Sequence, residues 1–154
     1  MSYQDLPIRS DTYSDYSYQP LLQAQPTGGG SVADFALRQS VAAIEKLRNL
    51  PDNWDGRGSV KPSDEDVDAA RQWLSLLHLS LSKIGAKWLR PHVAASEDGS
   101  AVLEWWHTQK KLTLYLNRNG AEFIKVWGPH IQNDMTDGEL TPSEFPAIWT
   151  WLSE

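Results

Sequence analysis

The chain has 154 residues and a formal net charge of −6, from 14 basic and 20 acidic side chains. Its length predicts one domain that can bury a core without cross-links, and its lack of cysteine excludes disulfides, thiolate zinc sites and cysteine nucleophiles. The basic residues are scattered, which argues against a nucleic-acid partner. The N-terminus lacks the basic and apolar regions of a signal peptide, and no apolar run approaches the roughly 20 residues of a membrane span. We therefore expect a cytoplasmic protein without a membrane partner.

Residues 1–30 are predicted to form a disordered tail, and residues 31–154 a single α+β domain. The tail mixes tyrosines with Ser, Asp, Gln and Pro, has no helical or strand period, and ends in three glycines. A solvated extension is the simpler interpretation, and a docking peptide that orders on a partner is the alternative. In both cases we expect a chain that starts at Ser31 to unfold at nearly the same midpoint as the full chain.

Two helices are expected next. The first begins after Ser31, where Asp34 completes a start resembling a capping box. The second has Ser63 as its N-cap, acidic residues in its first turn and Gly85 just beyond its last turn. The apolar stripes that should face the core are Leu37, Val41, Ile44 and Leu47 in the first helix, and Val67, Ala70, Leu74, Leu77, Leu81 and Ile84 in the second.

The segment Leu50–Ser59 joins these helices and places one indole among turn-forming residues and carboxylates. The simpler interpretation is a compact connection, in which Trp54 packs into the core and Asp55 caps neighbouring backbone N–H groups. The alternative is a recognition loop that binds a partner through Asp52, Trp54, Asp55 and Arg57.

Several motifs of the chain, in this order, resemble the pattern of a family of small bacterial proteins. That pattern runs Leu-Pro-x-x-Trp-Asp-Gly-x-Gly, Pro-Ser, a helix, a strand introduced by proline, an Asp-Gly turn and Leu-Glu-Trp. The resemblance covers about half the chain and implies no particular activity. The chain departs from the pattern at Ser59-Val60 and in having Trp106 after Trp105. The matching motifs are Leu50–Gly58, Pro62-Ser63, Pro91, Asp98-Gly99 and Leu103-Glu104-Trp105.

From residue 91 the apolar period changes to two, which predicts a four-stranded antiparallel β-meander. Asn119-Gly120 is expected to form a two-residue hairpin turn that pairs Leu116 with Phe123. Leu112, Leu114 and Leu116 should then face the helices, while Tyr115, Ile124 and Val126 lie on the opposite face. The four strands are expected over residues 92–97, 101–106, 111–117 and 121–127.

The opposite face of this sheet is more apolar than a solvated face should be. We expect it to be covered by a C-terminal helix, by a second copy of the chain or by another protein. The C-terminal helix follows a loop over 128–140, in which a short strand near 138–140 is the one regular element expected. Thr141-Pro142-Ser143-Glu144 is a capping box that opens the helix with Pro142 at its first position. The alternative is a start at Ser143, which places Pro146 inside the first turn.

No catalytic or metal-binding signature is present. No two of the four histidines have the i, i+4 spacing of a helical zinc site. The serines lack a Gly-x-Ser-x-Gly context, and residues 134–139 lack the ligand series of a calcium loop. We therefore expect no catalytic residue, no metal and no cofactor.

The expected function is that of a non-enzymatic partner-binding protein, such as an antitoxin, an immunity protein or an accessory subunit. The acidic charge suits a basic protein partner, and the eight tryptophans suit a binding surface; self-association is also compatible with the apolar sheet face. One alternative is a hydrolase-like enzyme with a site around Asp52, Asp55, Glu104 and His107, and another is a structural subunit of a phage or mobile-element assembly. The expected binding residues are Asp52, Trp54, Asp55, Arg57, Tyr115, Ile124 and Val126.

Overall fold

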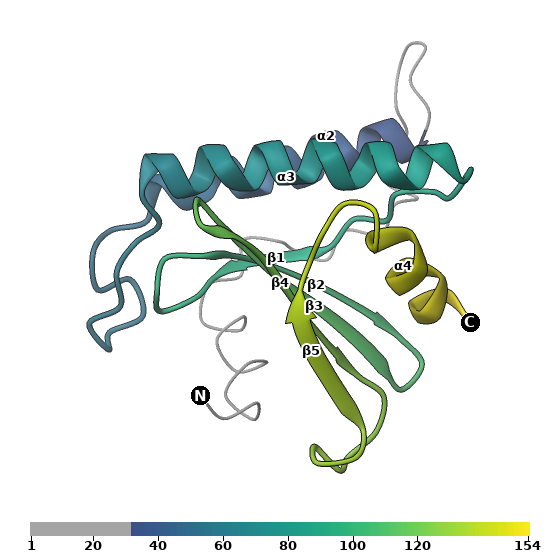
Figure 1. Cartoon of the computed structure of the whole chain (residues 1–154). Coiled ribbons are helices and arrows are strands. Elements are labelled where there is room, and N and C mark those ends of the chain that lie inside the picture. The colour runs from purple at the N-terminus through teal and green to yellow at the C-terminus, as the bar shows by residue number, and fades with distance from the viewer. Residues whose placement is uncertain (1–31) are drawn as a thin grey trace.

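The computed structural model describes residues 32–154, so the prediction of a tail over residues 1–30 lies outside the described residues. Three helices pack on one face of a five-stranded antiparallel sheet (Figure 1), which confirms the α+β class. Within residues 32–154, no helix combines the length and the apolar character needed to cross a bilayer. The elements are α2 (Val32–Lys46) with a 3₁₀ turn (Leu47–Asn49), α3 (Asp64–Lys83), β1 (His92–Ala95), β2 (Ala101–His107), β3 (Lys110–Asn117), β4 (Gly120–Val126), β5 (Met135–Glu139) and α4 (Phe145–Ser153).

The helices α2 and α3 form an antiparallel pair above the sheet (Figure 1). Ser63 caps α3 as predicted, because its hydroxyl accepts a hydrogen bond from the backbone N–H of Asp66 at 3.0 Å. Arg48, at the end of the first helical segment, reaches Asp64 and Asp68 at the start of α3 at 3.1 and 2.7 Å. The prediction that Ile84 belongs to the buried stripe is wrong: Ile84 is the C-cap of α3, beyond its last helical turn, and is 53% exposed.

The β3–β4 hairpin differs from the predicted register by two residues. Asn117 pairs with Gly120, so Arg118 and Asn119 form the turn and Leu116 lies opposite Ala121. The turn begins early because the side chain of Asn117 accepts a hydrogen bond from the backbone N–H of Asn119 at 2.8 Å, an arrangement that asparagine favours. A shift of two residues leaves every side chain on its predicted face.

The sheet has a fifth strand, β5, beyond the predicted four-stranded meander. A short strand was expected near residues 138–140, and the strand observed there is longer and begins earlier, at Met135. β5 pairs with β4 over its full length, from Val126 opposite Met135 to Glu122 opposite Glu139. Its sequence, Met-Thr-Asp-Gly-Glu, lacks the apolar alternation that marks the other strands. It becomes a strand because the edge of β4 supplies backbone hydrogen-bond partners, which a search for side-chain periodicity cannot detect.

The last helix begins at Phe145, later than the capping box suggested. Thr141 and Glu144 do interact: the Thr141 hydroxyl donates to the Glu144 carboxylate at 2.9 Å, and the Glu144 N–H donates to the Thr141 carbonyl at 3.1 Å. These bonds close a turn that precedes the helix. Pro146 then occupies the first helical turn, where its missing N–H does no harm.

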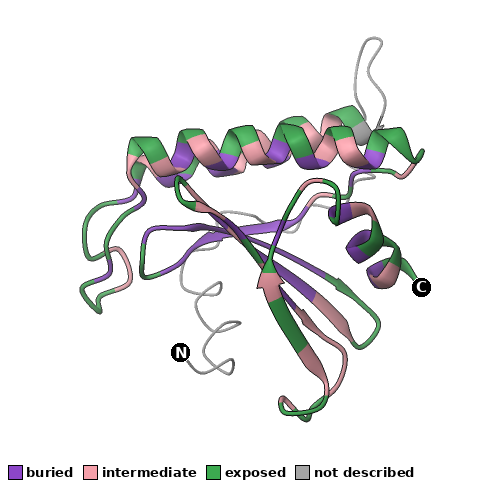
Figure 2. Cartoon of the chain, viewed as in Figure 1, coloured by how far each residue is buried: buried purple, intermediate pink, exposed green. Residues whose placement is uncertain are grey.

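The inner face of the sheet, which we define as the face under the helices, forms the core (Figure 2). Leu112, Leu114 and Leu116 are fully buried there, as predicted. Trp105 contacts Trp149 of α4 edge to face at 5.3 Å, and Trp88 stacks on Trp149 at 6.2 Å. Because Trp105 lies on the inner face, α4 covers the same face as α2 and α3. Of the three covers expected for the opposite face, the C-terminal helix is therefore wrong.

Candidate binding surface

We define the outer face of the sheet as the face away from the helices. It carries every second side chain of each strand, because successive side chains point to opposite faces. No helix of the described part of the chain lies on it. Several of its side chains are nevertheless buried, among them Val102, Thr113 and Ile124. The outer face comprises His92, Ala94, Val102, Glu104, Trp106, Lys111, Thr113, Tyr115, Glu122, Ile124, Val126, Met135, Asp137 and Glu139.

An ionic cluster occupies the β1–β3 part of the outer face. Glu104 lies between His92 and Lys111: its Oε1 is 3.0 Å from His92 Nδ1, and its Oε2 is 2.6 Å from Lys111 Nζ. The Lys111 ammonium also lies 5.1 Å from the ring centroid of Trp106, which is 53% exposed. The carboxylate of Glu104 is fully buried, so its charge is tolerated only because a cation is paired with it.

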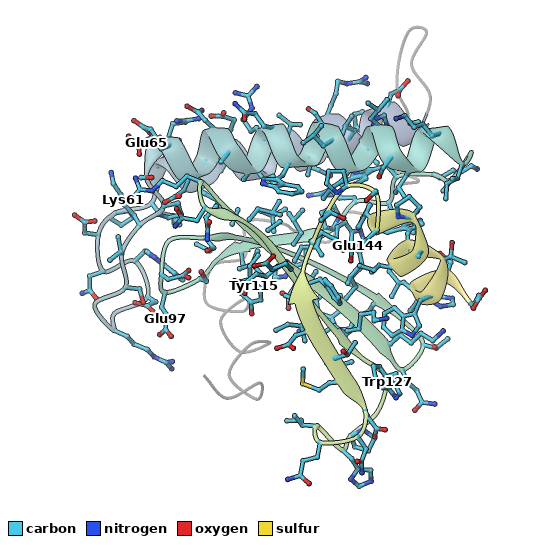
Figure 3. All side chains as sticks on the ribbon, viewed as in Figure 1. Lys61, Glu65, Glu97, Tyr115, Trp127 and Glu144 are labelled. Atoms are coloured by element: carbon cyan, nitrogen blue, oxygen red, sulfur yellow. The ribbon has the colours of Figure 1, made fainter. Side chains whose placement is uncertain are left out.

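An acidic groove of about 790 Å³ lies at the other end of the sheet, where the β1–β2 turn meets β3, β4 and β5. Its lining contains five carboxylates and no Lys, Arg or His. Figure 3 places Glu97 and Tyr115 toward this end, and Trp127 toward the opposite end. The carboxylates are Glu97, Asp98, Glu122, Asp137 and Glu139.

Two of these carboxylates lie directly opposite each other. Glu122 of β4 pairs with Glu139 of β5, and both side chains are exposed on the outer face. Like charges at directly opposite strand positions destabilise a sheet. Asp137 is the partner of Ile124 in the same ladder, so the edge of the groove concentrates negative charge beside an apolar side chain.

Asp98 remains ionised in this acidic surrounding. Partial burial raises the pKa of Asp98. Hydrogen bonds from the side chain of Ser96 and the backbone N–H of Ser100 together lower the pKa by more than burial raises it, so the pKa lies below its ordinary value. The β1–β2 turn therefore keeps a negative charge at the mouth of the groove in neutral solution.

The predicted sheet residues lie where expected on the outer face, and two of them line the groove. Tyr115 and Ile124 are part of its wall, whereas Val126 lies farther along β4, opposite Lys111. Sequence reasoning missed Glu122, Asp137 and Glu139. The alternation of β4 does place Glu122 beside Ile124, but the two β5 residues could not be assigned to the site without the fifth strand.

The loop Leu50–Ser59 is closed by its own hydrogen bonds. The Asp55 carboxylate accepts hydrogen bonds from the backbone N–H of Arg57 at 2.9 Å and from the backbone and side chain of Ser59. These bonds, led by that from the Ser59 hydroxyl, lower the pKa of Asp55. Trp54 is half-buried against the core and donates from Nε1 to the Val60 carbonyl at 3.3 Å.

These contacts give Trp54 and Asp55 a structural role in the loop, while Asp52 and Arg57 are exposed. The loop joins the β1–β2 turn through the backbone, because the Val60 N–H donates to the Glu97 carbonyl at 3.4 Å. Glu97 also lines the acidic groove. The end of the loop therefore lies beside the turn that contributes to the groove with Tyr115 and Ile124, whereas Val126 lies away from it.

The residues of the hydrolase-like alternative do not form one site. Glu104 belongs to the outer face and His107 to the inner face, because side chains three positions apart on a strand point in opposite directions. Glu104 is bound to His92 and Lys111, and Asp55 to its own loop.

Among residues 32–154, no three side chains of His, Asp or Glu are gathered closely enough to hold a metal ion. Comparison of the chain with protein-family models, with curated proteins and with solved structures gave no match.

Proposed function

We propose that the protein is a non-enzymatic partner-binding protein, of the kind represented by antitoxins, immunity proteins and accessory subunits. Its partner is a protein segment that carries Arg or Lys next to an apolar residue. The segment binds in the acidic groove, where its cations meet the five carboxylates and its apolar side chain contacts Tyr115 and Ile124. The resemblance to small bacterial proteins is compatible with this role.

The observation that carries the proposal is the Glu122–Glu139 pair. An isolated sheet gains nothing from two carboxylates at directly opposite positions, and loses on the order of 0.2–1 kcal/mol through their repulsion. A cationic side chain of a partner removes that repulsion and forms a charge-assisted hydrogen bond to each carboxylate. Surfaces kept for binding often reduce stability in this way.

The test uses a synthetic nine-residue peptide that contains two arginines and a leucine, titrated into the full chain by calorimetry. In Glu122→Gln/Glu139→Gln we expect the affinity to fall about tenfold or more, while the melting temperature stays constant or rises. This combination distinguishes a binding site from a structural pair, whose removal would lower the melting temperature.

The matched control is Asp64→Asn/Asp68→Asn, which removes the same charge from exposed positions at the start of α3. An equal loss of peptide affinity in both double variants would show attraction by net charge alone and would contradict the proposal. So would a clear loss of stability in Glu122→Gln/Glu139→Gln.

A further inference from the structure

A second recess, of about 410 Å³, lies at the opposite end of the sheet from the acidic groove. Its wall comes from the β2–β3 turn, the last residues of β4 and the end of α4. It contains two lysines and two tryptophans and no carboxylate. The lining residues are Thr108, Gln109, Lys110, Lys125, Trp127 and Trp151.

Both ammonium groups lie against the same indole. The Nζ of Lys110 is 5.4 Å from the ring centroid of Trp151, and that of Lys125 is 5.0 Å from it. Lys110 also donates a hydrogen bond to the Trp151 carbonyl at 2.7 Å, near the negative end of α4. The indole and the helix end thus hold two like charges together at the half-buried floor of the recess.

Neither lysine has a carboxylate partner within residues 32–154. Ion pairs of that part of the chain include Arg48, Arg71 and Arg118, and none is formed by Lys110 or Lys125. In a chain of net charge −6, two adjacent half-buried lysines without an acid form a local site of opposite sign. An anion that enters the recess gains attraction from both ammonium groups and relieves their mutual repulsion.

The volume of the recess and its tryptophans indicate what the anion is attached to. Trp127 meets Trp151 nearly edge to face, with centroids 6.3 Å apart, and is only half-buried. A planar ring can pack on Trp127 while its anionic group reaches the lysines. The volume suits a small molecule, because ligand pockets usually span about 300–1,000 Å³.

We propose that this recess binds a small aromatic oxyanion, a ring that bears a carboxylate or a phosphate. The site is independent of the acidic groove: it has the opposite charge, lies under α4 on the inner face, and selects the opposite kind of ligand. It can therefore exist whether or not the groove binds a basic partner.

The experiment titrates the full chain with phenyl phosphate, benzoate and neutral benzyl alcohol at millimolar concentration, and follows the indole N–H signals by NMR. Signals of Trp127 and Trp151 are assigned with Trp127→Phe and Trp151→Phe. We expect both signals to shift with the two anions and not with the alcohol. The two anions also show whether phosphate or carboxylate is preferred.

Lys125→Gln should weaken binding of the preferred anion about tenfold, and Lys125→Arg should retain most of it. The matched control is Lys87→Gln, an exposed lysine outside the recess. Melting curves confirm that the variants are folded. Absence of shifts at Trp127 and Trp151, or a difference below about threefold between Lys125→Gln and Lys87→Gln, would overturn the proposal.

Discussion

The two faces of the sheet use the same five strands in different ways. The inner face buries leucines and tryptophans against three helices, and the indole N–H groups of Trp88 and Trp105 donate to Ser40 and to the Leu89 carbonyl. The outer face also buries side chains, but these include Glu104, His92 and Thr113.

The difference separates two physical tasks. Apolar burial on the inner face stabilises the fold in proportion to the area removed from water. Buried ions on the outer face add little net stability, yet leaving one of them without its partner is costly. We therefore expect the inner face to determine the stability of the domain. On the outer face we expect the buried ions to limit which substitutions the sheet tolerates and which ligands it binds.

The largest effect should come from truncating the inner aromatic cluster. Trp88→Ala removes a side chain that is 2% exposed and that contacts Trp105, Trp149 and Ser40. We expect a loss of about 3–5 kcal/mol in the free energy of unfolding, measured by urea denaturation. A loss below about 1 kcal/mol would mean that the inner face is not the dominant core.

The next effect sharpens the contrast between apolar and ionic burial. Glu104→Leu leaves the Lys111 ammonium without its carboxylate in a largely buried position, and we expect a loss of about 3 kcal/mol. Adding Lys111→Leu should recover the part of that loss that comes from the unpaired ammonium, although His92 Nδ1 still lacks the Glu104 carboxylate. If adding Lys111→Leu recovers none of the loss, an unpaired ammonium is not what Glu104→Leu costs, and the contrast between the faces fails.

A smaller effect is expected for the connecting loop, which belongs to neither face. Trp54→Ala should cost about 2 kcal/mol, less than for Trp88, because the indole is only half-buried. Thermal melting of Trp54→Ala and Trp54→Phe side by side checks this, since phenylalanine keeps part of the packing and loses the hydrogen bond to Val60. Unchanged melting combined with loss of peptide binding would make the loop a recognition element.

The smallest effect concerns pH and the mouth of the acidic groove. The pKa of Asp98 in the folded chain lies below its ordinary value of 3.8, so the ionised carboxylate stabilises the fold above that value, and the contribution disappears as pH falls through the folded pKa. The stability difference between wild type and Asp98→Asn should therefore be constant near neutral pH and shrink below about pH 4. Urea denaturation across this range measures it, and a difference that grows in acid would contradict the assignment.

The sequence predicted the features that depend on consecutive residues, such as helix caps and strand alternation. It missed features that depend on contacts with another element of the fold. Ser63 and Gly85 mark the ends of α3, and the alternation of β3 identifies its inner leucines, because capping and strand period are properties of consecutive residues. For β5 only a short strand near residues 138–140 was expected, and neither its start at Met135 nor its place in the sheet was predicted, since its pairing depends on the edge of β4. For that reason the carboxylates of the groove were not recognised as one site.

The exact turn between β3 and β4 was missed for a related reason. Asn117, Asn119 and Gly120 all favour turns. The hydrogen bonds from the Asn119 N–H to the Asn117 side chain and from the Arg118 N–H to Asp66 favour the observed loop. The side on which α4 packs depends on the fit among Trp88, Trp105 and Trp149, residues far apart in the chain.

The order of elements along the chain has a consequence for synthesis. α2 and α3 leave the ribosome before β1 to β5, so their apolar stripes are made before the sheet that will cover them. At about 5–20 residues per second, they wait for several seconds until β3 follows. The sheet then closes quickly, because each strand pairs with its neighbour in sequence and contacts of short range fold fastest. Aggregation or chaperone capture during translation should therefore act on the helical half of the nascent chain.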